Sequence, residues 1–125
     1  MVRVLSLVLK RIWYDMILHH GKVEEYREIT PYWVNRLLKE VDFDGNEKRI
    51  KLEQGVIINL DNLKTLIASH HLEFRYQRGD FVEFALGYSK DRPTMIKTIK
   101  AITIGKGKKE WGANPNKDYF IIHFS

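Results

Sequence analysis

The 125-residue chain contains no cysteine and only three prolines. The absence of cysteine excludes disulfide bonds, thiolate metal sites and cysteine nucleophiles, and it is typical of proteins from a reducing compartment. Long apolar runs are also missing, because Lys10 and Arg11 interrupt the apolar start of the chain. We therefore expect a cytoplasmic protein without a membrane-spanning segment.

The chain also lacks internal repeats and any Pro-, Gly- or Ser-rich stretch that would separate two cores. Its size is close to the commonest size of one domain. Hydrophobic residues make up 44% of the sequence and include three Trp, six Tyr and six Phe, which is enough to fill one core. A single domain over residues 1–125 is the expectation.

Acidic residues are scarce in the last third, and the formal net charge is +5. The basic excess there comes from Lys90, Arg92, Lys97, Lys100, Lys106, Lys108 and Lys109. Such a surface favours a partner that carries phosphate groups. The alternative is a basic surface that only keeps the protein in solution.

Hydrophobic spacing in the first part of the chain predicts alternating strands and helices. An apolar run over 2–8 is typical of a strand that is buried on both faces or closed into a barrel. An amphipathic helix should follow it and end at Gly21, and a charged strand should occupy 22–29. Thr30 as a cap and Pro31 as the first helical residue predict a second helix to about Leu38.

The remainder begins with a polar segment, 42–55, that should form a loop around Asp44, Gly45 and Asn46. Asp61 is then expected to cap a third helix that reaches His71. From residue 72 onward the pattern changes to strands, with segments at 72–76, 81–86, 95–104 and 119–124. This order predicts an α+β fold that closes into a small mixed β-barrel.

The segment His19–Ile29 is the most informative part of the sequence, because it places charges in a potentially half-buried strand. Glu25 and Arg27 fall on one face of that strand, and Lys22 at its start can fold over the same cleft. A lysine and an arginine beside a carboxylate can orient a base edge and a phosphate. The alternative is an exposed ladder of salt bridges on an edge strand.

This segment resembles the ASCH domain family. A strand and a Trp-containing helix precede a glycine-lysine turn, with Glu25 three positions after Lys22 and Arg27 five positions after it. The turn at Arg78, Gly79 and Asp80 is similar to the step that opens the barrel half of that family. The resemblance implies a PUA-like β-barrel with flanking helices, and residues 41–71 would be an insertion in it.

The resemblance implies RNA or nucleotide binding, or a small hydrolase. One branch of the family acts on acetylated cytidine and uses a lysine with a threonine three residues later, a position that is Glu25 here. In such an enzyme Lys22 and Glu25 would be the catalytic pair, with Glu25 as a general base on water. Ribonuclease activity is the other enzymatic alternative. Because a carboxylate cannot replace the hydroxyl nucleophile, binding is the preferred hypothesis.

Further candidate ligand-binding residues lie in the second half of the chain. Lys106, in the stretch Gly105–Lys108, could touch a phosphate backbone. Trp111 beside it, with Tyr88 and Ser89 after Gly87, could offer a stacking surface for an unpaired base. No metal site and no cofactor are predicted, because the histidines lack ligand spacing. A protein-interaction domain that uses the same surface is a third functional class.

Overall fold

A computed structural model describes all residues, 1–125, and the chain divides into two compact units. The first unit consists of Met1–Tyr26 and Tyr76–Ser125, and the second unit is the segment Arg27–Arg75. Strand β2 (Glu24–Glu28) runs across this division. The segment 41–71 lies within the second unit, whose sheet is separate from that of the first.

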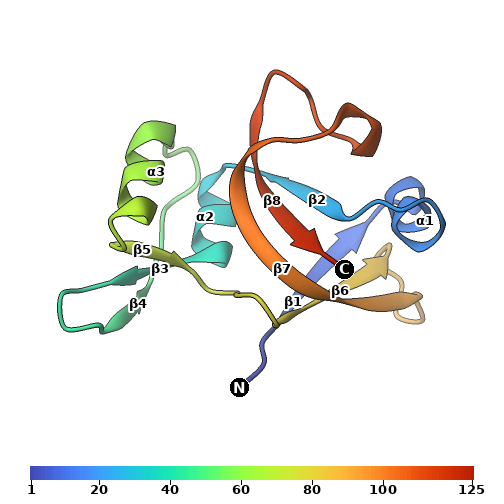
Figure 1. Cartoon of the computed structure of the whole chain (residues 1–125), viewed down its shortest axis with the longest axis horizontal. Helices are drawn as coiled ribbons and strands as arrows, with labels where there is room; N and C mark the ends of the chain where they lie inside the picture. The colour runs from blue at the N-terminus through green and yellow to red at the C-terminus, as the bar shows by residue number, and fades with distance from the viewer. The chain divides into compact units, whose positions relative to one another are not determined.

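The first unit contains a five-stranded sheet in the order β1-β6-β7-β8-β2. Its other strands are β1 (Val4–Leu9), β6 (Phe81–Leu86), β7 (Thr94–Lys106) and β8 (Asp118–Phe124). β1 and β6 are parallel, whereas β6, β7 and β8 pair in antiparallel fashion. β7 has a register irregularity between Ile99 and Ala101, and it bends so that the sheet curls (Figure 1).

The core of this unit lies on one face of the curled sheet. Leu5, Leu7 and Leu9 are buried, while Val4 is 49% exposed, so β1 is buried on one face and not on both. The rings of Phe84 and Phe124 pack edge to face at 4.9 Å between centroids. One-sided burial is what a strand in a barrel-like sheet requires, because only the inner face is covered.

Helix α1 (Arg11–His19) follows β1 directly. Tyr14 and Ile17 form its buried face, whereas Ile12 is 58% exposed, so the predicted apolar face is rotated by part of a turn. Gly21 has a φ of +75°, which permits the reversal after the helix. The N–H of Lys22 then donates to the carbonyl of Met16 at 3.1 Å, as in a glycine-terminated helix.

The second unit has a three-stranded antiparallel sheet in the order β4-β3-β5, with two helices. Its elements are α2 (Pro31–Leu37), β3 (Leu38–Val41), β4 (Glu47–Arg49), α3 (Leu60–Ala68) and β5 (Leu72–Phe74) (Figure 1). The predicted start of α2 is confirmed: Pro31 is its first residue, and the Thr30 hydroxyl accepts from the N–H of Trp33 at 3.4 Å.

Three expectations for the second unit were wrong in whole or in part. The expected turn around Asp44, Gly45 and Asn46 is confirmed, but it joins β3 to β4, so the polar segment 42–55 contains a strand and is not a loop throughout. The backbone pairing between Lys39 and Arg49 that forms this hairpin does not need apolar side chains. The cap of α3 is Asn59 and not Asp61: its side chain accepts from the N–H of Asn62, and Asp61 lies in the first turn. The last turn of α3 also ends before His71.

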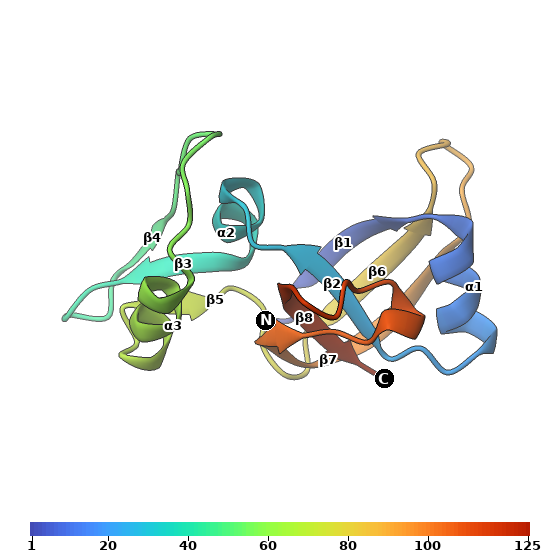
Figure 2. The ribbon, with the colours of Figure 1, turned by 90° about the horizontal axis from the view of Figure 1, so that it is seen from above.

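The α+β class and the strands of the second half are confirmed by β5 to β8. The long β7–β8 connection carries a short 3-10 helix, η1 (Lys109–Trp111). Both views place this connection close to α1 (Figures 1 and 2). None of the helices combines the length and the apolar character that crossing a membrane would require.

Candidate functional site

Lys22 and Glu25 form an ion pair inside the first unit. Lys22 follows the turn at Gly21, Glu25 lies in β2, and their Nζ and Oε1 atoms are 2.5 Å apart. The side chains are 0% and 5% exposed. β2 is an edge strand as expected, but the exposed salt-bridge ladder considered for it was wrong for this pair. The predicted charged cleft is closed at these two residues.

Two aromatic rings also lie close to the Lys22 ammonium. Its Nζ lies 5.0 Å from the ring centroid of Trp13 and 5.9 Å from that of Tyr26. Ring faces attract a cation, most strongly where water is excluded. The ammonium is therefore compensated by one carboxylate and by two aromatic side chains, from α1 and β2. No buried polar side-chain atom in the protein lacks a hydrogen-bond partner.

The segment 107–113 of the β7–β8 connection packs against the same two rings. A Cβ on Gly107 would lie 2.7 Å from Tyr26 Cε1 and 2.6 Å from the Cβ of Ala113. A Cβ on Gly112 would lie 2.9 Å from Trp13 Cζ2, and the φ of this glycine is +104°. Glycine at both positions therefore lets the backbone approach the rings closely. We call this segment the roof loop.

The hydroxyl of Tyr26 ties the roof loop to β2. It accepts a hydrogen bond from the N–H of Lys108 at 2.9 Å and donates one to the carboxylate of Glu24 at 2.8 Å. Burial raises the pKa of Tyr26 well above its usual value, and the neighbouring carboxylate of Glu24 adds to this rise. The neutral phenol is thus the form that holds the roof loop.

Trp111 is the aromatic residue that the roof loop presents. It is partly buried against a cluster of Tyr26, Ala113, Tyr119 and Ile121. The ammonium of Lys108 lies 4.3 Å from its ring centroid. Lys106 is exposed, and its Nζ lies 3.5 Å from a carboxylate oxygen of Asp118. The roof loop and the adjacent end of β7 therefore combine the indole ring of Trp111 with the lysines Lys108 and Lys106.

The other predicted site residues lie elsewhere. Arg27 belongs to the second unit, where its guanidinium carbon is 5.2 Å from the ring centroid of Trp33. Tyr88, which is 87% exposed, and Ser89 lie in the β6–β7 turn. The N–H of Gly87 donates to the carbonyl of Leu9, which places this turn near the start of α1, whereas Lys22 follows its end.

Sequence reasoning missed the residues that join Lys22 to the roof loop. Neither Trp13 nor Tyr26 was among the predicted site residues. The available signal was the pair of glycines, Gly107 and Gly112, on either side of Trp111. Glycine in a connection often marks close backbone approach, but the sequence does not say to which partner.

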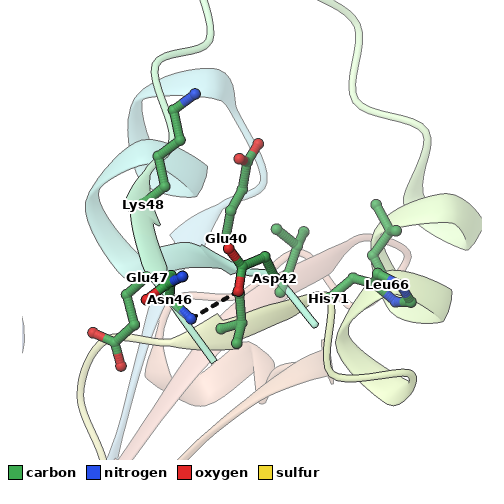
Figure 3. A pocket seen from close by; sticks show the side chains of 9 residues that line it. Glu40, Asp42, Asn46, Glu47, Lys48, Leu66 and His71 are labelled. Carbon is green, nitrogen blue, oxygen red and sulfur yellow. Dashed lines mark hydrogen bonds between the residues drawn. The ribbon is translucent and has the colours of Figure 1, made fainter. Parts of the chain in front are cut away.

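A separate pocket of about 520 Å³ lies in the second unit, between the β3–β4 hairpin and α3 (Figure 3). Three carboxylates line it together with apolar side chains, and its lining residues include Glu40, Asp42, Glu47, Leu66 and Leu72. Backbone N–H groups of Asn46 and Asp44 bind Asp42 and lower the pKa of its carboxyl group. No group of three or more His, Asp or Glu side chains is placed to hold a metal ion.

Comparison of the chain with protein-family models, with curated proteins and with solved structures found no match.

Proposed function

We propose that this protein binds single-stranded RNA through a PUA-like, ASCH-type barrel, at the roof loop that covers the Lys22–Glu25 pair. The observation that carries the proposal is the packing of one loop, rich in lysine and carrying Trp111, on the two rings that contact Lys22. The glycine-lysine motif and the basic loop are far apart in the sequence, and they meet at Trp13 and Tyr26.

Trp111 and the lysines would make the direct contacts. Every base has a π-face, so stacking on an indole ring accepts any unpaired base. A base on the outer face of Trp111 would take the place of the Lys108 ammonium, which would then move to a phosphate. Lys106 would contribute a second backbone contact, and its ion pair with Asp118 is partly exposed and therefore weak.

Lys22 and Glu25 would then act as positioning residues. A buried ion pair is held in one geometry, because an unpaired charge in the interior is costly. This pair fixes the orientation of Trp13 and Tyr26, on which the roof loop rests. The same burial gives less support to a hydrolase, because a general base on water has to reach water, and Glu25 is 4% exposed.

Titration of a fluorescent single-stranded RNA at low and at moderate salt tests the proposal. Trp111→Ala should weaken binding about 5- to 150-fold, in line with the cost of about 1–3 kcal/mol per stacked base. Tyr88→Ala, at an exposed tyrosine of the β6–β7 turn, is the matched variant that reports whether that turn also stacks on RNA. Absence of binding by the wild type at both salt concentrations would refute the proposal.

Incubation of the protein with acetylated cytidine and with RNA tests the enzymatic alternative in parallel. Turnover that is abolished by Glu25→Gln and retained by Trp111→Ala would replace binding by catalysis as the function of this site. Retention of RNA binding without turnover is the result that we expect.

A further inference from the structure

The second unit contains a basic pocket that shares no residue with the RNA site proposed above. It has a volume of about 380 Å³, within the range of about 300–1,000 Å³ that is usual for small-molecule sites. Its lining residues are Tyr32, Asn35, Arg36, Arg49, Ile50, Lys51, Leu52 and Arg75. Four of these are cations and none is a carboxylate. We call it the Arg49 pocket.

The fold brings three cations of this pocket together without an acidic partner. Arg49, Lys51 and Arg75 take part in no ion pair, and Arg49 and Lys51 are exposed. Like charges gathered without carboxylates repel one another and create a positive potential. An anion that entered the pocket would relieve this repulsion.

The backbone around the pocket is fixed by side-chain and main-chain hydrogen bonds. The amide of Asn35 accepts from the N–H of Leu52 and donates to its carbonyl, both at 2.8 Å. These two bonds hold the segment that carries Arg49 and Lys51 against α2. The N–H of Arg75 donates to the carbonyl of Leu37 at 2.8 Å. This bond holds the end of β5, where Arg75 follows the strand, against α2.

Tyr32 adds a flat apolar surface at the edge of the cations. It is 56% exposed, its ring packs edge to face on Trp33 at 4.9 Å, and its hydroxyl lies 3.4 Å from Arg36 Nη1. Arg36 in turn stacks on Trp33, with its guanidinium carbon 5.1 Å from the ring centroid. An exposed ring that is braced from two sides is suited to stacking with a base.

We propose that the Arg49 pocket binds a ligand that joins phosphate to an aromatic base, with the phosphate on Arg49, Lys51 and Arg75 and the base on Tyr32. A free nucleotide and a nucleic-acid strand share this chemistry. The pocket between the β3–β4 hairpin and α3 is unsuited to the same ligand, because Glu40, Asp42 and Glu47 line it and would repel phosphate.

Nuclear magnetic resonance titrations of the full ¹⁵N-labelled chain with pyrophosphate, adenosine monophosphate and a uridine hexanucleotide test this proposal. All three should shift the amide signals of residues 49–52 and 75. The hexanucleotide binding at least ten times more tightly than the mononucleotide would identify a strand as the source, and comparable affinities would identify a free nucleotide. Absence of shifts at these residues with all three probes would overturn the proposal.

Two double variants distinguish specific binding in the Arg49 pocket from non-specific attraction of a nucleic acid to a basic protein. Arg49→Ala with Lys51→Ala should weaken hexanucleotide binding at these residues about 10-fold and reduce its salt slope by about 1.4, the value for two phosphate contacts on a single strand. Lys64→Ala with Lys100→Ala removes the same charge from two exposed positions outside the pocket. An equal loss in both double variants would contradict a specific pocket.

Tyr32→Ala should weaken the mononucleotide and leave pyrophosphate unchanged, and a loss of both would contradict the stacking role. Trp111→Ala, which tests the roof loop, should leave the shifts at residues 49–52 unchanged. The two proposals can therefore fail separately.

Discussion

Lys22 in the first unit and Arg49 with Lys51 in the second unit lie in opposite environments. In the first unit, Lys22 is buried completely and compensated by Glu25 and two aromatic rings. In the second unit, Arg49 and Lys51 are exposed, beside other cations and without a carboxylate. A buried pair stabilises one geometry of its neighbours, whereas an uncompensated group remains able to bind an anion.

The largest expected effect comes from breaking the buried pair. Glu25→Ala leaves the Lys22 ammonium in the interior without its carboxylate, and this should lower the free energy of unfolding by about 3–5 kcal/mol. Urea denaturation of the wild type and of this variant measures the difference in the free energy of unfolding. The double variant Lys22→Met, Glu25→Met should recover most of that loss, because it removes both charges. A double variant as unstable as Glu25→Ala would contradict this account.

A second effect tests the packing of the roof loop. Gly107→Ala places a methyl group 2.6 Å from the Cβ of Ala113, so the loop or the ring of Tyr26 has to move. We expect a loss of about 1–3 kcal/mol in thermal or urea unfolding. Gly105→Ala is the matched control, because its Cβ would meet Ile121 Cδ1 at an ordinary 3.8 Å. Similar losses in both variants would argue against close packing at Gly107.

Removing the Tyr26 hydroxyl should have a smaller effect. Tyr26→Phe leaves the N–H of Lys108 and the carboxylate of Glu24 without this partner and should cost about 1–2 kcal/mol at neutral pH. Differential scanning calorimetry of the two proteins provides the measurement. An unchanged melting temperature would show that water replaces the hydroxyl without cost.

The same variant also predicts a dependence on pH. Because the pKa of Tyr26 is raised in the folded state, the folded protein keeps this proton more firmly than the unfolded chain does. The resulting stability is fully present below the ordinary tyrosine pKa of 10.0 and is lost as the pH rises above it. The advantage of the wild type over Tyr26→Phe should therefore shrink as the pH rises from about 10 to about 12. A constant difference over this range would refute the prediction.

The smallest effect is expected at an ion pair of the second unit. Lys39 and Glu47 are 2.6 Å apart across the β3–β4 hairpin, and the Glu47 side chain is 50% exposed. Lys39→Met should cost less than about 1 kcal/mol: although the Lys39 side chain is only 12% exposed, the Glu47 carboxylate keeps its contact with water. Urea denaturation at low and high salt provides the measurement. A loss as large as that of Glu25→Ala would remove the contrast between the two units.

Local sequence signals predicted those elements whose side chains follow a clear period or carry a cap. Thr30 with Pro31 marked the start of α2, and the apolar strands of the second half were found from their alternation. The β3–β4 hairpin was missed because Lys39, Lys48 and Arg49 carry no apolar pattern, and its pairing is made by backbone groups. At the start of α3, Asn59 and Asp61 are both residues that cap helices well. The cap is Asn59 because its backbone is extended, whereas Asp61 already lies in the first helical turn.

The sequence by itself determined that Lys22 and Glu25 are close, because Glu25 follows Lys22 by three positions, directly after the turn at Gly21. Only the tertiary structure decided that they are buried, because Trp13 and the roof loop, which come from other parts of the chain, exclude water from the pair. In the same way, the sequence supplied the excess of basic residues. The fold alone gathered Arg36, Arg49, Lys51 and Arg75 around one pocket, since distances between residues far apart in sequence depend on how the backbone packs.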